Sequence, residues 1–461
     1  MSVGLAVAGS WAVAGCGGDR GGGGEQVSRS GTTPDRQGAL AVRVVDGDRD
    51  TPVRGAQVVA FRRGEVIARA SSDAAGTARV PAGTRLVEVS ARGMSDGRAS
   101  VRGAPVEVDV YDPDLQSPEY GGGPARERHV PAVAAGPPAG PPAWSFASRT
   151  LIEFPPAVDR GLVVVGVNSG RVYALNADTG RIIWARRQKG AIASSPAISG
   201  DTVLISSMDG ALTAYTRAHG TPLWRFSTGG SPVESSPLVV DGLAYVGAWN
   251  GRLYAVDVET GRPEWEYQGP AEIKGSAALA GGLVVFGDYA GRVHALDPAT
   301  GAERWTYRGG QRFYGGPAVS GDTMVIGDVG GAVMALDART GGERWRHRTG
   351  AFVYSSPAIA EGMAYVGSYA GRFEALAVST GAVRWSFDAG GRISGSATVV
   401  AGIVYTAVLA RPGEPRRTFG LDARTGAVRY RGTDGRYSPA VGAGTTLYIV
   451  GTRHLHAHPA P

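Results

Sequence analysis

A repeat of about 40 residues constrains the fold of this chain more than any other feature of its sequence. Large aromatic residues recur in one phase, at intervals of 40 or 41 residues with a final interval of 45. They are Trp144, Trp184, Trp224, Trp265, Trp305, Trp345, Trp385 and Tyr430. A fixed period near 40 with short apolar runs is typical of β-propellers, in which each repeat forms one four-stranded blade. The sequence therefore predicts an all-β propeller over residues 143–461.

A glycine stands four residues before seven of these aromatics. The seven are Gly180, Gly220, Gly261, Gly301, Gly341, Gly381 and Gly426. A tight turn between two strands needs a left-handed residue, which glycine supplies without a Cβ clash. We place these glycines in the turn between the third and fourth strands of each blade. We expect the aromatics to pack between neighbouring blades, each burying on the order of 200 Å².

The ends of the repeat region predict how the ring closes. After Tyr430 the chain has residues for three strands, and the missing fourth strand stands at the start, in residues 143–146. One blade is then shared between the two ends, which removes both open edges of the ring. The count is eight blades.

The chain before residue 143 divides into two parts. Residues 39–112 contain short alternating runs such as 41–45, 57–61 and 86–90, which predict a small β-sandwich. The sequence segments 52–58 and 72–78 resemble those of the carboxypeptidase regulatory-like domain. This resemblance implies an accessory module without catalytic residues. Residues 113–142 hold eight Pro and five Gly and predict a semi-rigid linker.

The first residues indicate export. Residues 3–14 form a short apolar run that ends at Ala14-Gly15-Cys16, and Cys16 is the only cysteine of the chain. This resembles a bacterial lipobox, which implies a signal peptide over 1–15 and lipid on Cys16. Residues 16–38, rich in Gly and Ser, then predict a flexible tether. We expect a protein held by this lipid alone on the outer side of the bacterial cytoplasmic membrane.

The repeat itself resembles a known family. Residues 251–265 and 291–305 follow the pattern Gly-x-(Leu/Val)-Tyr-Ala-Leu-Asp-x-x-Thr-Gly-x-x-x-Trp, with small variations. This is similar to the pyrroloquinoline quinone (PQQ)-like repeat, shared by quinoprotein alcohol dehydrogenases and by non-enzymatic envelope propellers such as the BamB group. We expect no catalytic residue and no cofactor. The alternative is a small PQQ-dependent oxidoreductase, for which the resemblance implies PQQ, calcium and a pair of adjacent cysteines that this chain lacks.

Two groups of side chains suit metal ions but also have structural explanations. Asp288 and Asp328 could supply oxygen ligands under the enzymatic alternative, and we expect them to be solvated turn residues. His454, His456 and His458 alternate, so they share one face of a strand and could bind a metal. The same positions in other repeats pack between blades, so we predict no metal site. The 47 basic and 41 acidic residues give a net charge of +6, with no stripe that would predict nucleic-acid binding.

The loops of one propeller face vary more than those of the other. The four strands of a blade, A to D from the channel outwards, alternate in direction, so the D–A and B–C loops emerge on one face. The C–D turns emerge on the other face and repeat one motif. Variation on one face of a repeat protein indicates the binding face.

We predict that an envelope protein or a cell-wall component binds to this face of a monomer. The Pro- and Arg-rich insertion 410–417 belongs to the same face. The candidate residues are Trp249, Tyr289, Arg312, Tyr314, Tyr354, Arg392, Arg411, Arg416, Arg417, Arg436 and Tyr437.

Overall fold

The structure, a computed structural model, describes residues 39–130, 137–138, 140–411, 413–437 and 439–459. The expected signal peptide, Cys16 and the tether lie outside the described residues. Apart from one short 3-10 helix, every named element in the described part of the chain is a β-strand. None of its helices is long and apolar enough to cross a membrane.

The small N-terminal domain consists of two four-stranded sheets that share one apolar core. Alternating Val and Ala side chains from both sheets, such as Val44 and Val58, are fully buried in this core. One sheet has the order β2-β1-β5 with β8 beside β1, and the other has the order β4-β3-β6-β7. The strands are β1 (Ala39–Asp46), β2 (Thr51–Pro52), β3 (Gln57–Arg62), β4 (Glu65–Ser71), β5 (Thr77–Pro81), β6 (Leu86–Ser90), β7 (Gly97–Ser100) and β8 (Val106–Val110).

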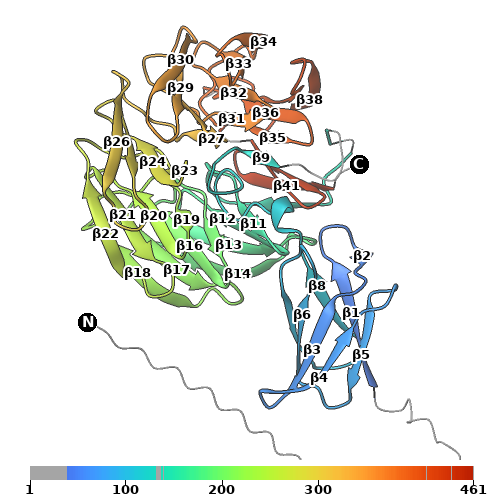
Figure 1. Cartoon of the computed structure of the whole chain (residues 1–461). Coiled ribbons are helices and arrows are strands. Elements are labelled where there is room, and N and C mark those ends of the chain that lie inside the picture. The colour runs from blue at the N-terminus through green and yellow to red at the C-terminus, as the bar shows by residue number, and fades with distance from the viewer. Residues whose placement is uncertain (1–38, 131–136, 139, 412, 438, 460–461) are drawn as a thin grey trace, which may run out of the picture. The chain divides into compact units, whose positions relative to one another are not determined.

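The repeat region forms eight antiparallel sheets within the described residues, each with four strands from this region. Seven are continuous in the chain, from β11-β12-β13-β14 to β35-β36-β37-β38, and we number them as blades one to seven. The eighth, the closing blade, has the order β39-β40-β41-β10. The order of the sheets along the chain is also their order in Figure 1, from green to red. These sheets confirm the predicted all-β propeller.

The inner three strands of each blade are mostly buried, whereas the outer strand of six blades contains only exposed and half-buried residues. The A strands are β11 (Ala157–Asp159), β15 (Ala197–Ser199), β19 (Leu238–Val240), β23 (Ala278–Ala280), β27 (Ala318–Ser320), β31 (Ala358–Ala360), β35 (Thr398–Val400) and β39 (Ala440–Ala443). The B strands are β12 (Leu162–Gly166), β16 (Thr202–Ser207), β20 (Leu243–Gly247), β24 (Leu283–Gly287), β28 (Thr323–Gly327), β32 (Met363–Gly367), β36 (Ile403–Ala407) and β40 (Thr446–Val450).

The outer half of each blade carries the repeat motif. The C strands are β13 (Arg171–Asn176), β17 (Ala211–Thr216), β21 (Arg252–Asp257), β25 (Arg292–Leu296), β29 (Ala332–Asp337), β33 (Arg372–Ala377), β37 (Thr418–Asp422) and β41 (His454–Pro459). The D strands are β14 (Ile182–Arg187), β18 (Pro222–Ser227), β22 (Pro263–Gln268), β26 (Glu303–Arg308), β30 (Glu343–Arg348), β34 (Val383–Asp388), β38 (Val428–Gly432) and β10 (Trp144–Ala147).

Seven of the repeated aromatics each contact the C–D turn of the next blade. Each indole Nε1 donates a hydrogen bond of 2.6–3.3 Å to a carbonyl oxygen of that turn. Each ring also lies on the turn glycine, where an added Cβ would come within 2.4–2.7 Å of a ring atom. Trp184 is buried, but the other six are only partly buried because they stand on outer strands.

The eighth aromatic, Tyr430, has no C–D turn to contact. It stands in blade seven, and the C and D strands of the closing blade belong to opposite ends of the propeller sequence. There, β41 pairs with β10, with Trp144 opposite Ala457 and Ala147 opposite His454. Tyr430 instead packs against Tyr405 of its own blade, with ring centroids 6.2 Å apart. The exchange of Trp for Tyr thus coincides with the missing turn.

The segment expected to be a linker contacts all eight A strands over residues 113–130, which we call the axial segment. It contains a 3-10 helix, η2 (Pro113–Leu115), and a short strand, β9 (His129–Val130), that pairs in parallel with β35 (Figure 1). In blades two, four, five, six and seven its carbonyl oxygens accept hydrogen bonds from the backbone N–H groups of Ile198, Leu279, Val319, Ile359 and Val399. The carboxylate of Glu119 accepts one from Val239 in blade three. Ser117 bonds to Val158 in blade one and to Gly442 in the closing blade.

These contacts explain why the axial segment is ordered. The A strands form the inner edges of the blades, and an unpaired N–H group at such an edge is costly when it is buried. The axial segment supplies one such acceptor to the A strand of each of blades one to seven, and in the closing blade its Ser117 hydroxyl donates to the carbonyl oxygen of Gly442. Its Pro and Gly content is therefore explained by an irregular path around the axis, and the expected semi-rigid linker is wrong for residues 113–130.

The axial segment also buries charged groups at the centre of the propeller. Arg126 donates to the carbonyl oxygens of Ala277 and Pro237 at 3.0 and 2.8 Å, and its Nη1 lies 3.5 Å from Oε2 of Glu119. The guanidinium of Arg128 lies 3.8 Å from the ring centroid of Tyr120. All four side chains are at most 5% exposed. Pairing and backbone acceptors offset the cost of burying the charges of Glu119 and Arg126.

Candidate functional site

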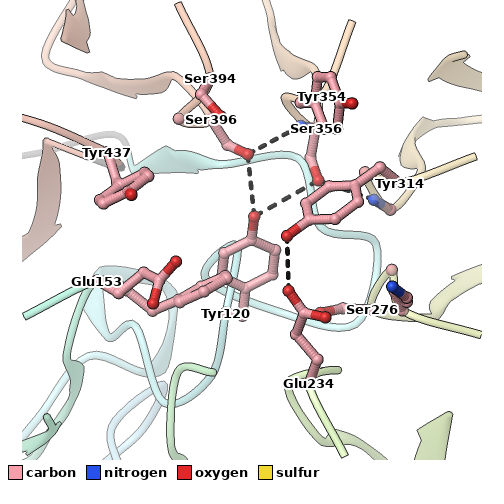
Figure 2. Close-up of a pocket in the computed structure, with 16 residues that line it drawn as sticks. Tyr120, Glu153, Glu234, Ser276, Tyr314, Tyr354, Ser356, Ser394, Ser396 and Tyr437 are labelled. Carbon is pink, nitrogen blue, oxygen red and sulfur yellow. Dashed lines mark hydrogen bonds between the residues drawn. The ribbon is translucent and has the colours of Figure 1, made fainter. Parts of the chain in front are cut away.

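A small pocket lies on the axis, on the face that carries the D–A loops. Its walls come from residues that directly precede the A strands, among them Glu234, Lys274, Tyr314 and Tyr354, and the ring of Tyr120 reaches it from the axial segment. The cavity volume is about 70 Å³. In Figure 2 the Tyr120 hydroxyl points towards Ser356 and Ser396, with oxygen distances of 3.4 and 3.0 Å. The axial segment therefore contributes to the base of the pocket.

Aromatic rings and cations surround one side of this pocket in an unbroken series. The ammonium of Lys274 lies 3.9 Å from the ring centroid of Trp249 and 4.4 Å from that of Tyr289. Ring contacts then continue from Tyr289 to Tyr314 at 6.4 Å and from Tyr314 to Tyr354 at 5.0 Å.

The series ends in a stacked pair. Tyr354 and Tyr369 are stacked with centroids 4.8 Å apart, Phe352 lies against both, and Arg392 stands 5.6 Å from the Tyr369 ring. We call these residues the aromatic belt: Trp249, Lys274, Tyr289, Tyr314, Phe352, Tyr354, Tyr369 and Arg392. Phe352 is 49% exposed, and the other members are partly buried. The belt is thus an amphipathic surface whose rings hold one another in place.

Glu234 joins the belt to the pocket. Its carboxylate accepts a hydrogen bond from the Tyr314 hydroxyl at 2.6 Å and another from Trp249 Nε1 at 3.2 Å. Burial, with this carboxylate nearby, raises the pKa of the Tyr314 hydroxyl, so Tyr314 remains a neutral donor. Across the pocket (Figure 2), burial and the charge of Glu234 raise the pKa of the Glu153 carboxyl, against the opposing effect of Arg436. The pocket therefore holds two carboxyl groups of which one is destabilised as an anion.

The insertion 410–417 folds back onto the propeller. Arg417 donates to the carbonyl oxygen of Gly390 at 3.0 Å, and Arg416 lies 3.8 Å from a carboxylate oxygen of Asp434. Arg411, Arg416 and Arg436 line a second hollow of about 410 Å³ together with Glu414. Three guanidinium groups around one hollow suit a ligand that carries carboxylates.

The structure brings most of the sequence-predicted residues together. Arg312 lies 5.6 Å from the ring centroid of Tyr289, and Arg436 lies 5.3 Å from that of Tyr437, a pocket residue. Sequence reasoning missed Tyr120, because it lies in the segment taken for a linker. It also missed the serines of the pocket wall, since a Ser-Ser-Pro motif at a strand start carries no signal of its own.

The residues at the axis do not fit PQQ with calcium. Organic cofactors occupy pockets of roughly 300–1,000 Å³, well above the volume found here. Asp288 and Asp328, expected to be solvated, are at most 1% exposed, so that expectation is wrong. Asp288 accepts from the N–H of Arg292 and contacts His294, and Asp328 accepts from two N–H groups of its own loop. Both carboxylates hold their B–C loops in shape and do not line the pocket.

Comparison with known proteins relates the chain to one group of propellers. A family model described as "Outer membrane protein assembly factor BamB" matches residues 126–288, 196–312 and 289–433. The protein of that name from Yersinia pestis is 36% identical over 108 residues, 23% of this chain and 28% of that protein. The one from Burkholderia pseudomallei is 30% identical over 145 residues, 28% of this chain and 38% of that protein. The matched part of this chain thus spans about a third of these relatives.

Solved structures share the fold at low identity. BamB from Moraxella catarrhalis is 20% identical with a TM-score of 0.52, covering 61% of this chain and 94% of that one. A europium-containing methanol dehydrogenase is 15% identical with a TM-score of 0.61, covering 73% and 89%. These likenesses concern the fold alone, whereas the family model matches most of the propeller in sequence. The chain therefore belongs to the PQQ-like repeat β-propellers, in the family described as outer membrane protein assembly factor BamB.

Proposed function

We propose that this protein is a non-catalytic scaffold of the bacterial cell envelope that binds a protein or cell-wall partner through the face carrying the D–A and B–C loops. The aromatic belt is the observation that carries this proposal. The relatives named above are outer membrane protein assembly factors, which supports a role in the envelope. The poor fit of PQQ and calcium to the axis argues against the oxidoreductase alternative.

The chemistry of the belt suits a macromolecular partner better than a small substrate. Aromatic residues and arginine are enriched in protein interfaces, where they provide most of the binding free energy. Ring-to-ring contacts fix the positions of Tyr314, Tyr354 and Tyr369 before a partner arrives, which reduces the entropy lost on binding. The opposite face repeats the Asp-x-x-Thr-Gly turn.

Capture of partners from detergent-solubilised envelopes of the producing bacterium tests the proposal. We expect the double variant Trp249→Ala/Tyr369→Ala to lose most of the envelope protein or cell-wall fragments that the unaltered chain retains. The matched control is Glu259→Ala/Arg424→Ala, two exposed side chains of the C–D turns. Equal capture by both double variants, with unchanged thermal midpoints, would show that the belt is not the binding face.

We also propose that lipid on Cys16 holds the mature chain at the membrane. The apolar run that ends at Cys16 supports this membrane location, and the family relationship agrees with it. Membrane fractionation of the producing cells is expected to place the unaltered chain with membranes and Cys16→Ser in the soluble fraction. Equal distribution of both forms would contradict a lipid anchor.

A further inference from the structure

The histidine stripe of β41 meets an acidic residue from a distant loop. The rings of His454 and His456 are stacked with centroids 5.6 Å apart. Asp434, in the loop between β38 and β39, places its Oδ2 2.8 Å from Nδ1 of His454. One donor atom from each of these three residues lies within 4.8 Å of the other two. The sequence did not indicate Asp434, which is 20 residues away from the stripe.

We propose that Asp434, His454 and His456 bind a divalent transition-metal ion of the zinc, nickel or copper class. Two imidazoles and one carboxylate are donors that these borderline ions prefer, whereas magnesium and calcium prefer oxygen donors alone. With metal–ligand bonds of about 2.0–2.1 Å, a tetrahedral ion separates its ligand atoms by roughly 3.3 Å. The three donors therefore need only small side-chain movements to reach this geometry. A fourth position stays open to water or to a ligand.

A contact with Ser145 orients the ring of His456. Its Nδ1 lies 2.8 Å from the hydroxyl oxygen of Ser145 in β10, within hydrogen-bond distance. This hydrogen bond orients the ring and leaves the other ring nitrogen, Nε2, for an ion.

The second oxygen of Asp434 is held from the other side. Its Oδ1 accepts a hydrogen bond of 3.2 Å from the N–H of Thr452 and lies 3.8 Å from Nη1 of Arg416. These contacts keep Oδ2 beside His454. The positive charge of Arg416 also competes with a bound cation, so Arg416 should limit the affinity of the site.

A metal at this position would strengthen the closure of the ring. Asp434 comes from the connection between blade seven and the closing blade, and both histidines stand on β41, which pairs with β10. An ion would therefore link the loop between blade seven and the closing blade to the strand pair β41–β10, which closes the ring. Because it binds the folded state, it would raise the stability of the propeller by mass action.

Calorimetric titration and thermal unfolding of the untagged full chain with zinc chloride test this proposal. We expect one zinc ion per chain and a thermal midpoint that rises with zinc concentration, with no comparable effect of magnesium. The side chain of His454 is 47% exposed, so its replacement should not disturb folding. His454→Gln and Asp434→Asn should each weaken zinc binding at least tenfold. Arg416→Gln should tighten it several-fold, and His219→Ala, an exposed histidine of another blade, should not change it.

Three outcomes would overturn the site. They are no zinc-dependent heat or midpoint shift in the unaltered chain, equal binding by His454→Gln, and an equal response to magnesium. This test does not use the aromatic belt, so its result is independent of the proposed scaffold function.

Discussion

The indole ring of Trp305 lies directly on Gly341 of the next blade. A Cβ atom on Gly341 would come within 2.5 Å of Cε3 of that ring, and the glycine has a φ of +72°. Nε1 of Trp305 donates to the carbonyl oxygen of Ala338 in the same turn at 3.3 Å. The same contact recurs at seven blade junctions, so one tryptophan and one glycine position each of these blades against the next.

Gly341→Ala tests this contact. The left-handed conformation alone costs an alanine about 1–2 kcal/mol, and the clash with Trp305 should add roughly 1–3 kcal/mol. Gly362→Ala is a matched control, because Gly362 has a φ of +74° and open space around it. Urea unfolding of both variants should give a clearly larger loss of stability for Gly341→Ala. Equal losses of unfolding free energy in the two variants would mean that the Trp305 ring moves aside and does not hold the turn in place.

Trp305→Ala should destabilise the propeller by about 3 kcal/mol, near the low end for the loss of an aromatic residue, because the ring is partly exposed. Trp305→Phe keeps a ring on the turn but removes the hydrogen bond to Ala338, and should cost about 1 kcal/mol. Chemical denaturation measures both. A loss below about 1 kcal/mol for the alanine variant would contradict a packing role.

The buried pair of the axial segment predicts strong coupling between Glu119 and Arg126. Glu119→Gln leaves the Arg126 charge without its partner and should destabilise the fold by about 3–5 kcal/mol. Arg126→Met should have a similar effect. The double variant should cost less than the sum of the single ones by at least about 1 kcal/mol. Strictly additive losses in a denaturation cycle would show that the two side chains act separately.

The raised pKa of Glu153 predicts a pH-dependent stability change. The folded state holds this proton more tightly than the unfolded chain, so the ionised carboxylate opposes folding at neutral pH. The cost decreases as pH falls through the folded-state pKa and vanishes below the ordinary carboxyl value. Glu153→Gln should therefore stabilise the protein at pH 7 and have little effect near pH 4. A stability gain that does not change with pH would exclude ionisation as its cause.

The sequence predicted those parts of the fold that repeat locally. The spacing between Gly341 and Trp345 lies within one hairpin, so it predicts the turn and the outer strand without knowledge of distant contacts. The position of Tyr120 could not be predicted in this way. Its neighbours Ser356 and Ser396 are more than 200 residues away in the sequence, and a Pro- and Gly-rich composition is shared by linkers and by irregular ordered segments.

The candidate site shows the same division. The order of the strands alone predicts that Tyr314 and Tyr354, which lie in D–A loops, stand beside the axial pocket. The contact between their rings depends on side-chain direction, which strand order does not predict. Asp288 was expected to be solvated because its position in the B–C loop is occupied by polar residues in other repeats. It is buried because its loop N–H groups and His294 need an acceptor at that point.

Site-specific photo-crosslinking in living cells of the producing bacterium tests the central claim, that the face with the aromatic belt binds an envelope partner. A photoreactive amino acid is placed at Tyr369 or Arg411 on this face, and at Glu259 or Arg424 in the C–D turns. We predict that Tyr369 and Arg411 crosslink to the same envelope component and that the two C–D turn positions do not crosslink to it. Crosslinks confined to the C–D turns would contradict the account.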